Sequence, residues 1–158
     1  MTTHAFCIYI HAPADKVWAA ITTSEYTKNW GYGGNVSCDL RPGGEYTNFT
    51  TDEMKAMGMG DVAVHGKVVE VDEPRRLVLD WQPAWYPDAE PTRLTWQLTE
   101  FEGGLTRVEL THDVTNNPPL GAEIAGGNDP GQGGGGWPWA LSGLKTLLET
   151  GSAMGAAA

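Results

Sequence analysis

The sequence GGGGWPWALSGLKTLLETG, residues 133–151, has the pattern of a single amphipathic helix near the end of the chain. Pro138 suits a first helical turn, and Gly151 suits the position just past a helix end. The apolar residues recur at spacings of three and four, and they are Trp137, Ala140, Leu141, Leu144, Leu147 and Leu148. Because only one side of this helix is apolar, we expect that side to be buried against the rest of the chain.

The residues before this helix alternate between apolar and polar side chains, as strands with one buried face do. A first strand is predicted at 6–10, with Phe6, Ile8 and Ile10 on one face. Two short helices follow, around 17–21 and over 25–29. Turn-forming Gly and Pro residues then separate the remaining predicted strands, which are 36–40, 45–50, 62–71, 76–81, 92–100 and 105–114.

Three connections lack a regular period. We place no element over 52–60, and the aromatic residues in 82–91 suggest a loop that covers something apolar. The stretch 115–136 is rich in Gly and Pro, and we expect a long loop there, either a lid or a linker. The resulting fold class is α+β, a curved antiparallel sheet wrapped around a long C-terminal helix, with two short helices after strand one.

The composition predicts one domain without a nucleic-acid or membrane partner. A chain of 158 residues is the size of a single domain, with a core over about 4–151 and a disordered tail over 152–158. The net charge of −10 argues against nucleic acid and against anionic membrane surfaces. No signal peptide or membrane span is apparent, so we expect a cytoplasmic protein. Cys7 and Cys38 are expected to be free, buried thiols.

Five motifs, in this order, resemble one known family: Ala12-Pro13-Ala14-Asp15-Lys16-Val17-Trp18, Asp39-Leu40-Arg41-Pro42-Gly43-Gly44, the stretch from Gly66 to Leu77, Thr111-His112-Asp113, and Gly135-Gly136-Trp137. The chain is similar to the SRPBCC superfamily, the START and birch-pollen-allergen-like proteins. Its motifs resemble the branch named after the C-terminal domain of the activator of heat-shock-protein-ninety ATPase. The resemblance runs from about Phe6 to Gly151 and implies the helix-grip fold.

The resemblance implies a deep cavity between sheet and helix that binds a hydrophobic small molecule in many relatives and serves chemistry in some, such as aromatic polyketide cyclases. The eukaryotic co-chaperone has a further N-terminal domain that this sequence does not contain. Ring hydroxylases of the superfamily need iron ligands, and no suitable spacing occurs here. We therefore expect no cofactor.

Seven tryptophans are many for one small domain, and they either line a cavity or fill a solid core. An indole also needs a partner for its N–H group when it is buried. The predicted cavity residues are Trp30, Tyr46, His65, Trp81, Trp85, Trp96, His112, Trp137, Leu141 and Leu144.

His112 is the best polar candidate for the cavity, because it shares strand parity with Val108 and Leu110 and should point inward. It either orients a ligand and acts as an acid or base, or it is a core histidine with satisfied hydrogen bonds. Asp113 should point to the other face and cannot orient His112 as in a triad. His65 ranks second, because the parity of its strand is ambiguous.

The four histidines lack the paired spacing of a metal site, and we predict no metal. No G-x-S-x-G sequence and no complete phosphate-binding loop occur. Three functions stay open. The first is a protein that binds a hydrophobic, ring-containing small molecule, and the second is a cyclase- or hydrolase-like enzyme with His112 as acid or base. The third is a co-chaperone-like interaction domain, and a homodimer is also open.

Overall fold

The element order of the protein follows the sequence prediction closely. The computed structural model describes residues 2–155. Its elements are β1 (Thr3–Ile10), α1 (Ala14–Thr22), α2 (Ser24–Thr27), β2 (Val36–Cys38), β3 (Glu45–Phe49), α3 (Asp52–Ala56), β4 (Val62–Asp72), β5 (Arg76–Pro83), β6 (Thr92–Phe101), β7 (Leu105–Asp113), α4 (Leu120–Ala125), the short 3₁₀ helix η1 (Pro130–Gln132) and α5 (Gly136–Thr150).

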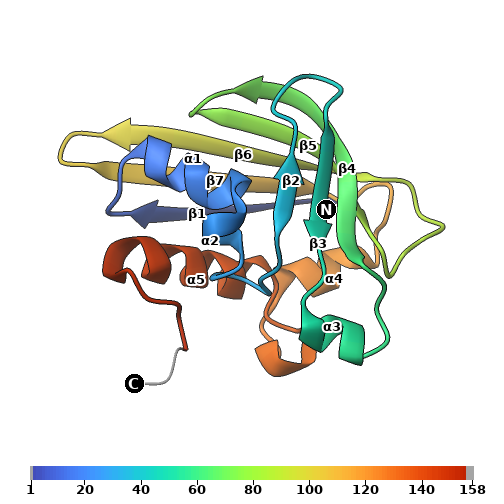
Figure 1. Ribbon diagram of the computed structural model, residues 1–158. Coiled ribbons are helices and arrows are strands. Elements are labelled where there is room, and N and C mark those ends of the chain that lie inside the picture. Colours follow the sequence, from blue (N-terminus) through green and yellow to red (C-terminus); the bar gives the residue numbers. More distant parts are fainter. Residues whose placement is uncertain (1, 156–158) are drawn as a thin grey trace.

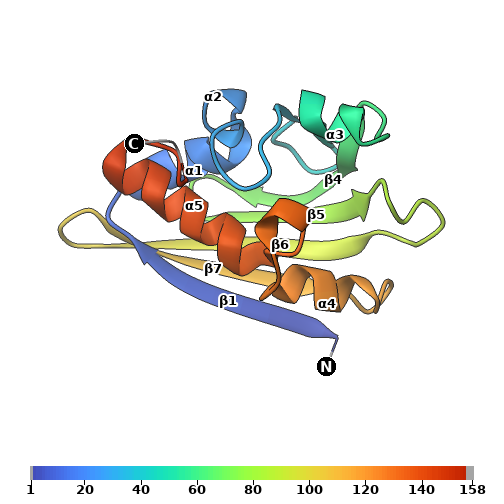
Figure 2. The same cartoon turned by 90° about the horizontal axis from the view of Figure 1, so that it is seen from below.

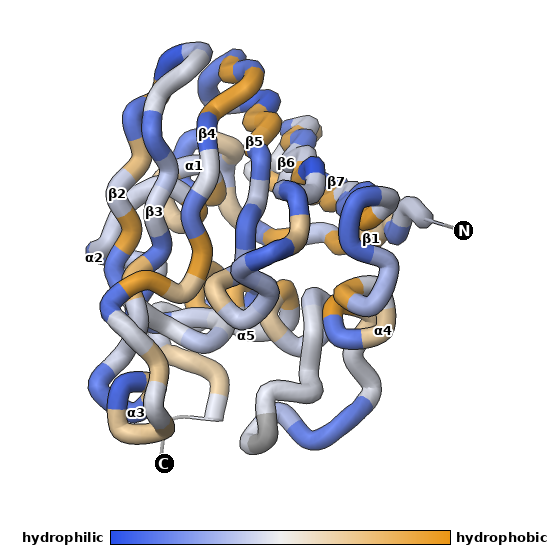
Figure 3. Tube along the Cα trace, turned by 90° about the vertical axis from the view of Figure 1, so that its right-hand side faces the viewer, coloured by the Kyte–Doolittle hydropathy of each residue, from blue (hydrophilic) through white to orange (hydrophobic). Residues whose placement is uncertain are grey.

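The strands form one antiparallel sheet of seven strands in the order β1-β7-β6-β5-β4-β3-β2. The sheet curves, and α5 lies across its concave face (Figures 1 and 2). Viewed from the side, the strands arch over α5, with α3 and α4 lying at opposite sides of that helix (Figure 3). This is the predicted helix-grip arrangement, and the α+β prediction is confirmed.

Side chains alternate strictly between the two faces of the sheet, and those on the inner face point toward α5. Along β7 the residues Thr106, Val108, Leu110 and His112 are buried, whereas their neighbours in the strand are only partly covered. His112 therefore points inward and Asp113 outward, as their parity predicts. Thr106 is satisfied in this interior because its hydroxyl donates to the carbonyl of Ala12 at 2.7 Å.

Helix α5 ends where the sequence indicates. Gly151 has φ = 80°, a left-handed conformation that favours glycine, and its N–H donates to the carbonyl of Leu147 at 2.8 Å. Leu141 and Leu144 face the sheet and are fully buried, which contributes roughly 2 kcal/mol or more each. Lys145 donates to the carbonyl of Tyr9 at 2.6 Å and fastens α5 to β1.

Two expectations about connections are wrong. Residues 52–56 form α3, because the Thr51 hydroxyl accepts a hydrogen bond from Met54 N at 3.2 Å and caps the helix. The long loop over 115–136 contains α4 and η1, and α4 forms because Leu120 and Ile124 bury one side of a six-residue helix. The Gly and Pro content of the whole stretch obscured this short segment.

The cysteine expectation also needs correction. Both cysteines are free, but Cys7 is exposed on β1 and only Cys38 is partly buried. Burial and the neighbouring charge of Asp39 raise the pKa of the Cys38 thiol to about 11. That thiol is therefore protonated at neutral pH and is a poor nucleophile.

Candidate ligand-binding site

Four of the predicted cavity residues come together on the inner face of the sheet, and we call them the aromatic cluster: Trp81, Trp96, His112 and Trp137. The Trp81 ring lies 5.0 Å from the His112 ring and 6.1 Å from the Trp137 ring, measured between centroids. Trp96 meets Trp137 edge to face at 5.8 Å. Contacts of this geometry are favourable between aromatic rings, so the cluster stabilises the junction of sheet and α5.

Both ring nitrogens of His112 have hydrogen-bond partners. The Trp137 indole N–H donates to Nδ1 at 3.0 Å, so Nδ1 carries no proton. Nε2 then holds the proton and donates it to the Thr92 hydroxyl at 2.7 Å. That hydroxyl in turn donates to the carbonyl of Trp81 at 3.1 Å. The chain of bonds fixes the neutral tautomer and leaves His112 without a free nitrogen.

The surroundings of His112 keep it uncharged. Burial, and next the nearby His4, lower the pKa of His112 from 6.5 to about 4, while Asp113 acts weakly in the opposite direction. An acid or base at neutral pH needs a pKa near 7 and an accessible nitrogen. The geometry thus favours the core-histidine alternative over the acid or base.

Three further predicted residues border the aromatic cluster. Trp30 meets Trp96 edge to face at 6.3 Å, and its indole N–H donates to the carbonyl of Ala20 at 2.8 Å. Leu141 and Leu144 belong to the same core and are fully buried. Where a deep cavity was expected between sheet and helix, these side chains lie in mutual contact.

The remaining predicted residues lie apart from the cluster or at its margin. His65 is exposed on β4. Tyr46 is partly buried opposite Cys38 in the β2–β3 ladder, and burial raises the pKa of its hydroxyl. Trp85 is 46% exposed, and it meets Trp81 edge to face at 6.3 Å from the outer side.

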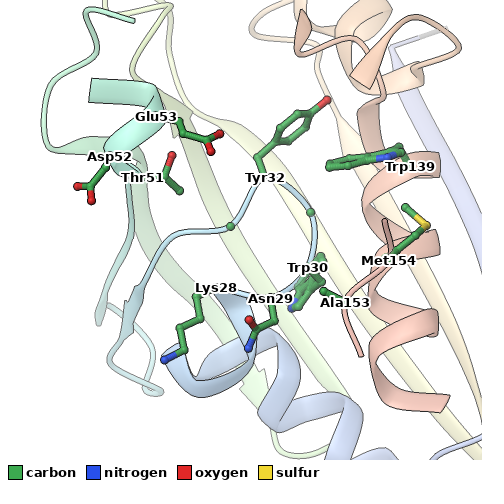
Figure 4. Close-up of a pocket in the computed structure, with 13 residues that line it drawn as sticks. Lys28, Asn29, Trp30, Tyr32, Thr51, Asp52, Glu53, Trp139, Ala153 and Met154 are labelled. Carbon is green, nitrogen blue, oxygen red and sulfur yellow. The ribbon is translucent and has the colours of Figure 1, made fainter. Parts of the chain in front are cut away.

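A hollow of about 430 Å³ lies beside α5, and Trp30 is one of the residues that line it (Figure 4). It is formed by the loop after α2, the start of α3, one side of α5 and the segment after α5. Its lining residues are Lys28, Asn29, Trp30, Gly31, Tyr32, Gly33, Thr51, Asp52, Glu53, Trp139, Gly143, Ala153 and Met154. We call this hollow the α5 pocket.

Glycines bring the two sides of the α5 pocket close together. A Cβ on Gly143 would lie 3.4 Å from the backbone N of Gly31, so α5 and the loop after α2 are in contact there. A Cβ on Gly135 would lie only 2.6 Å from the Cβ of Trp139. Gly135 N–H also donates to the Tyr32 hydroxyl at 3.0 Å. These contacts hold the Tyr32 and Trp139 rings 4.7 Å apart at the pocket wall.

Sequence reasoning found Trp30 but missed Tyr32, Trp139 and Gly143. Trp139 lies on the polar side of α5, where a large aromatic ring signals that something covers that side. Gly143 stands inside a helix, where glycine is unfavourable unless another chain segment approaches closely. Part of the predicted disordered tail also lines the pocket, because Ala153 and Met154 belong to it, whereas 156–158 lie outside the described residues.

Glu123 links α4 to the loop between β5 and β6. Its carboxylate accepts a hydrogen bond from the Trp85 indole N–H at 3.0 Å and another from the Tyr86 hydroxyl. We expect Glu123→Ala to speed amide exchange over 120–125 by roughly five-fold, the equivalent of about 1 kcal/mol. Hydrogen-exchange mass spectrometry measures this, with the exposed turn residue Glu102→Ala as control. Equal rates in both variants would contradict the link.

The described part of the chain offers neither a cluster of metal ligands nor a membrane-spanning helix. Within residues 2–155, no group of three or more His, Cys, Asp or Glu side chains is arranged to hold a metal ion. No helix in the same range has the length and apolar character needed to cross a membrane.

Solved structures that share this fold include the following three. CalU16 from Micromonospora echinospora is 24% identical, with a TM-score of 0.66 over 92% of this chain and 73% of that one. The Aha1 dimer from Colwellia psychrerythraea is 21% identical, with a TM-score of 0.67 over 96% and 98%. An Hsp90 activator from Plasmodium falciparum is 18% identical, with a TM-score of 0.59 over 98% and 91%.

Sequence comparison assigns the family. No curated protein matches the chain. The family model described as Activator of Hsp90 ATPase homolog 1-like protein matches residues 11–149, which is most of the chain and nearly the range of the predicted resemblance. The protein therefore belongs to the Activator of Hsp90 ATPase homolog 1-like family.

Proposed function

We propose that the protein binds a small molecule with an apolar ring system in the α5 pocket. The observation that carries this proposal is the wall of Trp30, Tyr32 and Trp139 around a hollow of about 430 Å³. Ligand pockets typically have volumes of about 300–1,000 Å³ and aromatic linings with a few polar groups. Flat rings bury much apolar area against such walls, which favours binding.

The position of the pocket adds support. Trp30 lines the pocket and also contacts Trp96 of the aromatic cluster, so the pocket wall continues into the rigid core. Tyr32 is anchored through its hydroxyl by Gly135 N–H. A wall that is already ordered loses little conformational freedom when a ligand binds, which favours affinity.

Protein contacts are the second candidate, and the comparisons favour them. The family description and the Plasmodium relative concern activators of Hsp90, and the Colwellia relative was solved as a dimer. We propose a homodimer as the first such contact to test, by light scattering during size-exclusion chromatography. A mass of about 17 kDa at every concentration would overturn the homodimer.

A thermal-shift screen tests ligand binding across several chemical classes at once. The screen compares aromatic polyketides, sterols, fatty acids and small aromatics such as 1-naphthylmethanol. A compound at a hundred times its dissociation constant should stabilise the fold by ~2.7 kcal/mol, which is visible as a rise in melting temperature. The absence of a shift in every class would contradict the proposal and direct attention to protein partners.

Gly143→Leu tests the position of the site. The new side chain enters the α5 pocket, where a Cβ at this position would lie 3.8 Å from both Trp30 Cβ and Met154 Cε. We expect 1-naphthylmethanol to bind at least ten-fold more weakly in isothermal titration calorimetry. Replacing glycine inside a helix favours helix formation by up to ~1 kcal/mol, which offsets part of the cost of packing a side chain against the Gly31 backbone 3.4 Å away. Far-UV circular dichroism and thermal melting check that the variant is folded before its affinity is measured.

Two matched variants control this experiment. Gly143→Ala adds only a methyl group and should cause a smaller loss of affinity. Trp85→Ala removes an exposed ring that does not line the α5 pocket, and it should leave affinity unchanged. Unaltered binding in a folded Gly143→Leu protein, or a loss in Trp85→Ala instead, would place the site elsewhere.

A further inference from the structure

The rim of the α5 pocket carries an unpaired acidic group. Asp52 and Glu53 stand in the first turn of α3, next to Thr51, and all three line the pocket. Figure 4 shows the Glu53 carboxylate directed toward Tyr32, whereas the Asp52 carboxylate points away from Tyr32. Glu53 is thus the acidic side chain that faces the aromatic wall.

The basic residues nearby do not neutralise Glu53. Lys28 lines the pocket, but its ammonium group points away from Tyr32 and Trp139 in Figure 4. Lys55 of α3 approaches Asp61 at 3.8 Å instead. Among residues 2–155 no ion pair involves Glu53. The negative charge at the rim therefore remains available to a ligand.

The aromatic wall itself also favours positive charge. Tyr32 and Trp139 line the pocket with their ring centroids 4.7 Å apart, and a cation near the electron-rich face of an aromatic ring is attracted to it. The whole chain has a net charge of −10, which draws cations toward its surface and repels anions. The aromatic wall of the pocket and the net charge of the whole chain therefore both favour a cation.

We propose that the ligand of the α5 pocket is a ring-containing cation, an aryl-alkyl ammonium or a protonated heterocycle, with Glu53 as its counter-ion. This inference rests on the proposed function and specifies its ligand class. The ring lies against Trp30, Tyr32 and Trp139, and the positive charge lies at the rim. Because Glu53 is exposed, the ion pair contributes a preference of roughly two- to five-fold and is weakened by salt.

Three probes that share one ring system test the charge preference. They are 1-naphthylmethylammonium, 1-naphthylmethanol and 1-naphthylacetate, which are positive, neutral and negative at pH 7. Isothermal titration calorimetry at low and high salt should rank the affinities in that order. The advantage of the ammonium over the alcohol should shrink as salt is added.

Glu53→Gln, which keeps the shape of the side chain, should abolish the two- to five-fold advantage of the ammonium while the alcohol still binds. Glu102→Gln removes an equal charge from an exposed turn residue that does not line the pocket, and it should preserve the advantage. If the alcohol binds as tightly as the ammonium in the wild-type protein, the ligand class is overturned and the proposed function stands. If none of the three probes binds, both are overturned. A preference that persists in Glu53→Gln overturns the role of Glu53.

Discussion

Replacing His112 by alanine is expected to lower the free energy of unfolding by about 3 kcal/mol or more. The side chain is fully buried, so the substitution leaves a cavity among Trp81 and Trp137. It also leaves the Trp137 indole N–H and the Thr92 hydroxyl without their partner. Urea unfolding followed by tryptophan fluorescence measures the change.

The exposed His65 provides the matched control. His65→Ala should change the free energy of unfolding by less than about 0.5 kcal/mol, as surface substitutions usually do. Similar unfolding midpoints for the two variants would mean that the interior bonds of His112 do not support the fold.

Acidification is expected to destabilise the protein by about 3 kcal/mol between pH 6.5 and pH 4 through His112 alone. Burial lowers the pKa of this imidazole from 6.5 to about 4 in the folded protein. As the pH falls, the unfolded chain therefore binds the proton first, and unfolding becomes more favourable. The contribution of His112 is fully present above pH 6.5 and is lost as the pH falls through that window.

Urea unfolding at a series of pH values measures this dependence. His112→Gln cannot take up the proton, so its stability should vary less with pH between 6.5 and 4 than that of the wild-type protein. The difference between the two curves removes the contribution of the carboxylates, which titrate in both proteins. Parallel curves would show that His112 is protonated equally easily in the folded and unfolded states.

The fold could be predicted because its elements are long and strongly patterned. Strand β7 alternates over its whole length, and α5 carries an apolar stripe closed by Gly151. Helices α3 and α4 and the 3₁₀ helix η1 were missed for the opposite reason. In α4 the large buried apolar residues are Leu120 and Ile124, and a helix of six residues is too short to display a period.

The residues in the interior of the site could be predicted from the sequence, but the way in which their side chains pack could not. Parity placed His112 inward, and the residues in contact with it, Trp81 and Trp137, were among the predicted set. Whether these rings line a void or touch one another depends on side-chain rotamers, which periodicity does not determine. The α5 pocket was missed because Tyr32, Glu53 and Trp139 come from three segments that only the tertiary fold brings together.

The most direct test of the account follows the tryptophan indole N–H signals during a titration with 1-naphthylmethylammonium. Each of the seven signals in a ¹H–¹⁵N spectrum is assigned through a Trp→Phe variant. Binding in the α5 pocket predicts progressive shifts for Trp139 and Trp30, while Trp81 and Trp137 stay in place. Shifts of Trp81 and Trp137 without any change at Trp139 would contradict the account and place the ligand between the sheet and α5.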